Sequence, residues 1–325
     1  MSRASRARAV ASAAAVGGAG LVGVGGALYG VLLGQTRLAR RRIGEPIAQA
    51  LNAEGTYGED DTDLAGQTPI SLVVLGDSGA AGFGVDRPEQ TTGAVAASGL
   101  ARALGRPVAL RSLAVVGAQS GDLQGQIDRI QEPWPDLALI IVGANDVTHR
   151  VPPGRSVAML TAAINRLRAH DINVVVGTCP DLGTVRPIPH PLRWVARRWS
   201  RSLAAAQMVA TVESGARAVA LADLLGPEFD AHPDRMFGPD RFHPSTEGYR
   251  ALAEALVPSL ADALSGPPTP DAGTTSLELA EAAAEAAEVG GAEVAVDTGS
   301  RLRGLLRLRR GGGAGEATPA EASEP

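Results

Sequence analysis

Three side chains with the chemistry of a hydrolytic site stand in two short stretches of this 325-residue chain. Asp240 and His243 are three residues apart, a spacing at which a carboxylate in a turn can hold one ring nitrogen of the histidine while the other ring nitrogen accepts a proton. Ser78 directly follows an apolar run and lies among small residues, so its hydroxyl and its backbone N–H can be exposed at one point. A serine beside such an imidazole is a nucleophile for acyl groups. Taken singly, Ser78 is equally well read as a helix cap.

Two further positions can supply hydrogen-bond donors to the same chemistry. Asn145 carries a neutral amide, which can stabilise a developing oxyanion without protonating it. Gly117 has no side chain, so its backbone N–H can come close to a ligand. Taken alone, Asn145 can instead be the first residue of an Asx turn. Gly117 taken alone is only weak evidence for a ligand site. Together with Ser78 and His243, they supply matching parts of one site.

The elements that must position these residues follow from the hydrophobic pattern. Short apolar runs alternate with longer amphipathic stretches, which predicts a parallel sheet covered by helices on both faces. We expect strands near residues 70–75, 108–116, 137–142, 174–176 and 218–221, and helices near 91–104, 120–130, 156–169, 191–214 and 246–264. Ligands of such sheets bind beyond the carboxyl ends of the strands, where Ser78, Gly117 and Asn145 stand.

In order and spacing, these segments resemble the four motif blocks of the SGNH hydrolase superfamily, also called GDSL esterases and lipases. The matching blocks are Gly76-Asp77-Ser78, Gly117, Gly143-Ala144-Asn145-Asp146 and Asp240-Arg241-Phe242-His243-Pro244. The resemblance covers residues 68–264. The first block continues with Gly79 where many relatives carry the leucine of the family's name, a change that affects the wall of the pocket more than the chemistry.

The resemblance implies a three-layer α/β/α, flavodoxin-like fold with a parallel five-stranded sheet. It implies a catalytic triad of Ser78, Asp240 and His243. The oxyanion hole would combine the backbone N–H groups of Ser78 and Gly117 with the side chain of Asn145. The implied reaction is ester hydrolysis through an acyl-enzyme, which needs no metal and no organic cofactor.

The substrate class stays open in the sequence. A small acyl ester, a lipid ester and an acetylated glycan all fit. An O-acyltransferase or glycan deacetylase with the same triad is the alternative enzyme, and a membrane-tethered protein that binds without catalysis is the alternative from another class. The segment 180–201, which contains Trp194, Trp199 and several arginines, is either a cap near an acyl chain or headgroup, or a helix with core tryptophans and solvated arginines.

The N-terminal segment predicts contact with a membrane. No charged residue occurs from Ala9 to Thr36, and arginines flank this stretch on both sides. Such a stretch exceeds the ~20 residues that cross a bilayer, so we expect residues 1–45 to be an uncleaved anchor, with a cleaved signal as the alternative. We expect the catalytic domain to lie outside the cytoplasm, although the flanking arginines do not decide the orientation.

The remaining boundaries and the composition complete the prediction. Residues 46–67 are expected to be a linker, and residues 265–325 a low-complexity tail without a stable fold. The apolar content of 45% suffices for a packed core, while the net charge of -5 gives no basic surface for nucleic acid. The single cysteine, Cys179, cannot form an intramolecular disulfide and is expected to be a small buried hydrophobe.

Overall fold

The structure is a computed structural model that describes residues 30–39, 41–44, 49–58, 64, 66–264 and 293–294. Most of the expected membrane anchor and most of the expected tail therefore lie outside the described residues. Within the described ranges, none of the helices has the length and apolar content needed to cross a bilayer.

A seven-stranded sheet forms the centre of the molecule, in the order β1-β3-β2-β4-β5-β6-β7. The five central strands are parallel, which confirms the predicted sheet, and their order is that of flavodoxin-like folds. The strands are β1 Gly55–Tyr57, β2 Ile70–Gly76, β3 Val108–Ser112, β4 Leu137–Ile141, β5 Asn173–Gly177, β6 Arg217–Val219 and β7 Glu293–Val294.

The two edge strands are antiparallel and were not expected. β1 pairs with β3 inside the stretch predicted as a linker, and β7 pairs with β6 inside the predicted tail. Both are only two or three residues long. Strands this short carry too little pattern to be recognised in a sequence, because alternation over about four residues is the usual signal.

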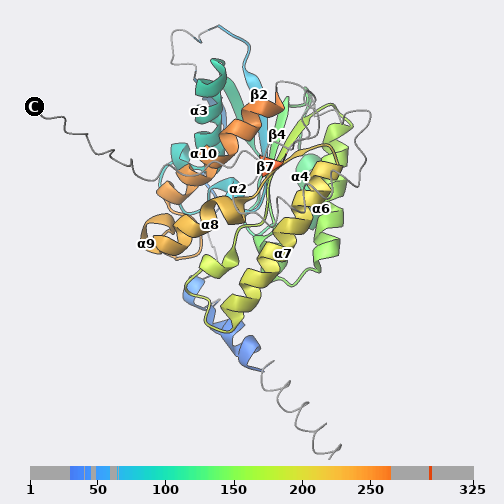
Figure 1. Ribbon diagram of the computed structural model, residues 1–325. Coiled ribbons are helices and arrows are strands. Elements are labelled where there is room, and N and C mark those ends of the chain that lie inside the picture. Colours follow the sequence, from blue (N-terminus) through green and yellow to red (C-terminus); the bar gives the residue numbers. More distant parts are fainter. Residues whose placement is uncertain are drawn as a thin grey trace, which may run out of the picture.

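Helices cover both faces of the sheet, as the three-layer prediction requires. Figure 1 shows α3 and α10 on one face and α4, α6 and α7 on the other. The helices are α2 Ser78–Ala81, α3 Thr92–Leu104, α4 Leu123–Ile127, α5 Ala144–Thr148, α6 Pro153–Arg168, α7 Leu192–Glu213, α8 Leu221–Ala231, α9 Pro233–Met236 and α10 Thr246–Ala263, with 3-10 turns η1 Pro88–Gln90, η2 Ser120–Asp122 and η3 Leu182–Thr184.

Alternate residues of β2 supply the two halves of the core. Leu72 and Val74 pack in the cluster with α3 and α10, whereas Val73 and Leu75 pack in the cluster with α4 and α6. This alternation follows from the two-residue period of a strand. Each such side chain contributes roughly 1.5–3 kcal/mol when it is fully buried. A strand that is apolar on both faces therefore belongs in the middle of the sheet, where β2 lies.

The central strands approach most closely where β2 ends. A side-chain Cβ on Gly76 would lie 1.9 Å from the carbonyl oxygen of Ile141 on β4, and the φ angle of Gly76 is 128°. Only glycine adopts this backbone conformation at so close a contact. The nucleophile block thus begins with a glycine because β2 and β4 leave no room for a side chain.

Candidate active site

Ser78 lies at the turn from β2 into the short helix α2. Asp77 caps this helix, and its Oδ1 accepts a hydrogen bond of 2.9 Å from the backbone N–H of Gly79. Because Ser78 is the first residue of the helix, its backbone N–H has no intrahelical acceptor. Gly82 ends the helix with a φ of 69°, where a Cβ would lie 2.6 Å from Thr91. The turn therefore presents the Ser78 hydroxyl and N–H together.

The segment that carries Asp240 and His243 is a closed loop before α10. Phe237 and Pro244 form an isolated β-bridge at its base, and the N–H of Gly238 donates to the carbonyl of His243 at 2.8 Å. Ser245 then caps α10 by accepting a hydrogen bond from the N–H of Gly248. The loop is thus fixed at both of its ends.

The structure brings the three predicted residues into one hydrogen-bonded chain. Ser78 Oγ lies 3.0 Å from His243 Nε2, and His243 Nδ1 lies 2.6 Å from Asp240 Oδ2. A carboxylate only accepts, so the Nδ1–H donates to Asp240 and leaves the Nε2 lone pair free to accept the serine proton. Ser78 and His243 are each only 7% exposed. This is the geometry of a nucleophile, a general base and an orienting carboxylate.

Hydrogen bonds to Asp240 favour its charged form. Partial burial by itself would raise its pKa, but the hydrogen bonds from the His243 ring and from the backbone N–H groups of Phe242 and His243 outweigh burial and lower the pKa below its ordinary value. Its Oδ1 accepts both backbone bonds, at 2.9 Å and 3.0 Å. Asp240 is therefore ionised at neutral pH and can stabilise a protonated His243.

Asp77, next to the nucleophile, is in the opposite electrostatic situation. It is 4% exposed, and its burial raises its pKa to about 6, against the opposing effects of the Gly79 hydrogen bond and the His243 ring. Two carboxylates near one imidazole thus have pKa values shifted in opposite directions.

The two predicted oxyanion donors stand at the same edge of the sheet as Ser78. Gly117 follows Val115, whose N–H donates to the carbonyl of Gly76 at 3.0 Å. Asn145 follows Ile141, whose carbonyl accepts from Asp77 N–H at 3.0 Å. Gly117 and Asn145 are therefore only two and four residues away from a backbone hydrogen bond with the turn that carries Ser78. In the described part of the chain, neither the Gly117 N–H nor the Asn145 amide has a hydrogen-bond partner of its own.

A buried carboxylate ties these two donor segments together. Asp146 is fully buried and accepts hydrogen bonds from the N–H and the hydroxyl of Ser120, both at 3.1 Å. Ser120 Oγ also lies 3.0 Å from Ser156 Oγ on α6. Burial raises the pKa of Asp146, and the bonds from Ser120 and Ser156 oppose that rise. Asp146 thereby fixes the loop that carries Gly117 relative to the helix that carries Asn145.

The segment 180–201 is held by ion pairs, which neither sequence interpretation anticipated. Buried Asp181 pairs with Arg197 at 3.2 Å and with Arg201 at 3.3 Å. Trp199 is partly buried against the core, whereas Trp194 is 62% exposed. The expectation of core tryptophans therefore holds for only one of the two.

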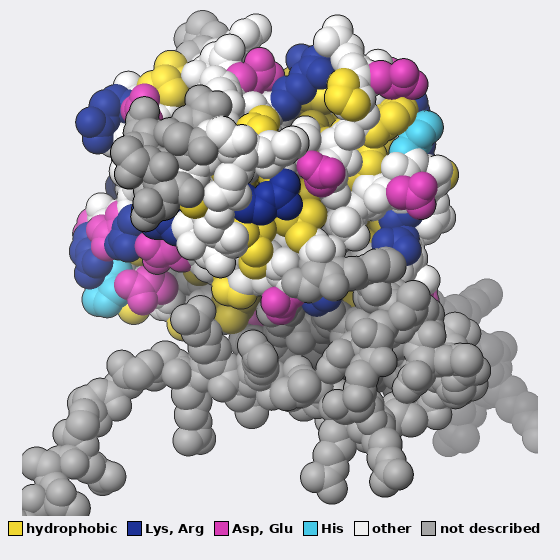
Figure 2. Space-filling view, turned by 90° about the horizontal axis from the view of Figure 1, so that it is seen from above, with side chains coloured by type: hydrophobic (Ala, Val, Ile, Leu, Met, Phe, Trp, Pro, Cys, Tyr) yellow, Lys and Arg dark blue, Asp and Glu magenta, His cyan; other side chains and the backbone are white. Residues whose placement is uncertain are grey.

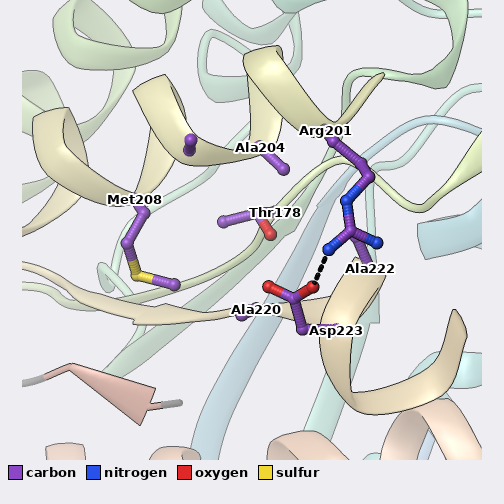
Figure 3. A pocket seen from close by; sticks show the side chains of 8 residues that line it. Thr178, Arg201, Ala204, Met208, Ala220, Ala222 and Asp223 are labelled. Atoms are coloured by element: carbon purple, nitrogen blue, oxygen red, sulfur yellow. Dashed lines mark hydrogen bonds and ion pairs between the residues drawn. The ribbon is translucent and has the colours of Figure 1, made fainter. Parts of the chain in front are cut away.

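A small pocket lies beside this segment but apart from Ser78. Thr178, Arg201, Asp223 and neighbouring apolar side chains line it, and Figure 3 shows the Arg201–Asp223 ion pair at its rim. Its volume of about 20 Å³ admits one water-sized molecule, which is too little for an ester substrate.

Comparisons with known proteins show the family of this chain. The pattern of the GDSL-like lipase/acylhydrolase family matches residues 74–251. A GDSL-like esterase of Mycobacterium tuberculosis is 38% identical over 263 residues, which are 79% of this chain and 83% of that protein. The chain belongs to the GDSL-like lipase/acylhydrolase family. It is therefore a serine-type hydrolase of ester bonds, and the resemblance noted in the sequence is confirmed.

Two solved structures with similar folds were also found for this GDSL-family chain. The psychrotrophic esterase EstA from a Pseudoalteromonas species is 18% identical and covers 60% of this chain and 99% of its own, with a TM-score of 0.48. The lipase/acylhydrolase from Enterococcus faecalis is 19% identical and covers 59% of this chain and 96% of its own, with a TM-score of 0.47.

Several residues of the GDSL site were not singled out from the sequence. Phe83 packs edge-on against the His243 ring at a centroid distance of 4.7 Å, and Phe242 packs on it at 4.9 Å. Asp146 was noted only as part of a block. Its position after Asn145, in a strand-end segment, was a usable signal, whereas the contact of Ser120 with it spans 26 residues and has no local signature. Cys179 is fully buried, as predicted.

Metal-ligating residues are not gathered at any site in the described chain. Within those residues, no group of three or more histidine, cysteine, aspartate or glutamate side chains is arranged to hold an ion.

Proposed function

We propose that this GDSL-family protein hydrolyses carboxylic esters through an acyl-enzyme on Ser78, with His243 as general base and acid. The observation that supports the proposal is the hydrogen-bonded chain from Ser78 Oγ through His243 to Asp240, with separations of 3.0 Å and 2.6 Å. Through these hydrogen bonds, the proton of the Ser78 hydroxyl can pass directly to His243 without entering bulk water.

The proposed reaction has two steps. Ser78 Oγ attacks the ester carbonyl while His243 Nε2 takes its proton, and the imidazolium that forms is stabilised by ionised Asp240. The N–H groups of Ser78 and Gly117 and the Asn145 amide donate to the oxyanion. His243 then returns the proton to the leaving alcohol. In the second step His243 activates a water molecule, which releases the acid and regenerates the Ser78 hydroxyl.

We further propose that the substrate is a small acyl ester, a lipid ester or an acetylated glycan, and that the enzyme is anchored to a membrane with its catalytic domain outside the cytoplasm. The uncharged stretch from Ala9 to Thr36 with arginines on both sides supports the anchor. Protease protection of the domain in intact cells, compared with lysed cells, tests the orientation. Equal protease sensitivity in intact and lysed cells is the outcome that supports it.

Hydrolysis of 4-nitrophenyl acetate and butyrate by the detergent-solubilised full chain tests the nucleophile. We expect Ser78→Ala to lower kcat/KM by about 10⁴-fold or more, as the loss of a triad nucleophile does. A fluorophosphonate probe should label the wild type on the peptide that contains Ser78, and label neither Ser78→Ala nor His243→Ala.

Ser202→Ala is the matched control, because Ser202 is exposed on α7. It should retain both hydrolysis and labelling. If Ser78→Ala hydrolysed the esters as fast as Ser202→Ala, the assignment of the nucleophile would be wrong. Transfer of the acyl group to an added alcohol in preference to water would identify an acyltransferase instead.

A further inference from the structure

The helical residues 30–39 and 41–43 are docked onto the catalytic domain. Gln35 makes two hydrogen bonds to the segment before α7: its Nε2 donates to the carbonyl of His190 at 2.5 Å, and its Oε1 accepts from the N–H of Leu192 at 3.0 Å. Arg42 donates to the carbonyl of Pro187 at 3.4 Å. Ala39 is 6% exposed and packs in the same cluster as Leu192. These contacts hold the helical residues 30–39, which include the end of the uncharged stretch, against the catalytic domain.

Apolar side chains remain exposed around this docked helix. Val31 is 48% exposed, Leu38 is 41% exposed and Trp194, in the first turn of α7, is 62% exposed. Only two other large apolar side chains in the described part of the chain are comparably exposed. Three of the five therefore lie on the docked helix or in the first turn of α7, which the docked helix contacts. Trp194 is two residues beyond the contact with Gln35. A tryptophan with its ring outside the core is typical of a membrane interface.

Unpaired arginines accompany these apolar side chains. Arg37, Arg41 and Arg198 are exposed and have no carboxylate partner among the described residues. Three neighbouring arginines pair with carboxylates instead: Arg186 with Asp230, Arg197 with Asp181 and Arg201 with Asp223. We call the set Val31, Arg37, Leu38, Arg41, Trp194 and Arg198 the basic apolar surface.

The basic apolar surface lies toward the catalytic end of the molecule. The segment that receives Gln35 follows β5, and the carboxyl ends of β5, β2 and β4 share one edge of the sheet. Figure 1 shows the docked helix at the lower end, below α2, which carries Ser78. Figure 2 shows the opposite end, where acidic and basic side chains are mixed. The basic apolar surface itself combines three arginines with three apolar side chains and contains no acidic residue.

We propose that the basic apolar surface rests on an anionic lipid bilayer and holds the sheet edge that carries Ser78 toward it. The proposal rests on the membrane anchor proposed above. The partner is a bilayer because the uncharged stretch leads directly into the docked helix, and about 20 residues of it precede residue 30. Arginines on such a surface are attracted to anionic lipid headgroups. The active site then opens close to the membrane plane.

Quenching of tryptophan fluorescence by brominated lipids tests the proposal in the full chain. The protein is reconstituted in vesicles of brominated phosphatidylcholine, with and without phosphatidylglycerol. We expect quenching that is stronger with phosphatidylglycerol, that is lost in Trp194→Phe and that persists in Trp134→Phe. Trp134 is the control because it stacks on His170, remote from the docked helix.

The charge is tested by a matched pair of variants. Arg198→Gln should weaken the dependence of quenching on phosphatidylglycerol, whereas Arg102→Gln, another exposed helical arginine without a carboxylate partner in the described part, should not. Equal quenching in both lipid compositions would overturn the role of the arginines. If the protein floats with the vesicles but Trp194 is not quenched, the surface is wrong and the anchor stands. If the protein does not float, both proposals are wrong.

Discussion

At the scale of single residues, hydrogen bonds and aromatic contacts fix the orientation of the His243 ring. Asp240 and Ser78 occupy its two ring nitrogens, and Phe83 and Phe242 pack against the ring. A ring held by two hydrogen bonds and two aromatic contacts loses little entropy when it reaches the reactive geometry. Asp77, the buried neighbour of Ser78, is the carboxylate of this group whose charged form is least favoured.

The raised pKa of Asp77 predicts a pH-dependent stability. Its value of about 6 in the folded protein exceeds the ordinary 3.8, so the folded state binds this proton more tightly than the unfolded state. The resulting stabilisation is present below the unfolded pKa and is lost as pH rises through the folded one. Relative to Asp77→Asn, the wild type should lose about 3 kcal/mol of unfolding free energy between about pH 4 and 7.

Urea denaturation of both proteins across this pH range measures the difference. Asp86→Asn is the control, because Asp86 is an exposed carboxylate. Its unfolding free energy should follow that of the wild type. An Asp77→Asn curve parallel to the wild-type curve would contradict the assignment.

At the scale of elements, the site is an arrangement of strand ends. The turns after β2, β3 and β4 each contribute one part, and backbone bonds such as Val115 N–H to Gly76 carbonyl hold neighbouring turns together. Side chains complete this arrangement where the backbone cannot. Asp146 does so between the Gly117 loop and α5, because it is fully buried and accepts two bonds from Ser120.

Substitution of Asp146 should therefore impair turnover more than substrate binding. In Asp146→Asn an amide group replaces one acceptor oxygen and faces the Ser120 donors, which costs about 1–3 kcal/mol of unfolding free energy. Complete loss of an oxyanion donor lowers kcat by about 10²- to 10³-fold, so a displaced donor should lower kcat by about 10-fold or more, with a smaller change in KM.

Steady-state kinetics with 4-nitrophenyl butyrate provide the measurement. Asp122→Asn is the matched control, since Asp122 also caps the η2 turn by accepting from Gln119 N–H but is exposed. It should retain nearly all activity. Equal losses in the two variants would show that the turn, and not the link to α5, is what matters.

At the scale of the whole molecule, α10 forms hydrogen bonds with the segment that follows β2. Tyr249 on α10 is fully buried, and its hydroxyl donates to the carbonyl of Phe83 at 2.8 Å across 166 residues of sequence. Burial raises the pKa of Tyr249 well above its usual value, so the hydroxyl keeps its proton and can donate at neutral pH. This bond fixes the Phe83 backbone, whose ring contacts His243.

Tyr249→Phe should lower both stability and activity. The lost bond and the unpaired carbonyl cost about 1–2 kcal/mol of unfolding free energy. A shift of the turn that carries Ser78 should lower kcat by about 10-fold.

Tyr57→Phe is the matched control. It removes a comparable hydrogen bond, from the Tyr57 hydroxyl to the carbonyl of Ala53, in the edge strand β1. Thermal unfolding and ester hydrolysis of both variants separate the effects: only Tyr249→Phe should lose activity, and unchanged activity in it would contradict the support.

The parallel sheet and the candidate reacting groups could be predicted from the amino-acid sequence. Apolar runs follow a local period, and a candidate nucleophile, base and carboxylate are recognisable from their types and order. Ser78, Asp240 and His243 were therefore predicted from the sequence, and the structure joins them by hydrogen bonds. The folded structure was needed to reveal the edge strands, the hydrogen bonds from Ser120 to Asp146, the hydrogen bond of Tyr249 and the docking of Gln35. These features depend on contacts between residues far apart in the chain, and neither partner of such a contact carries a local pattern that names the other.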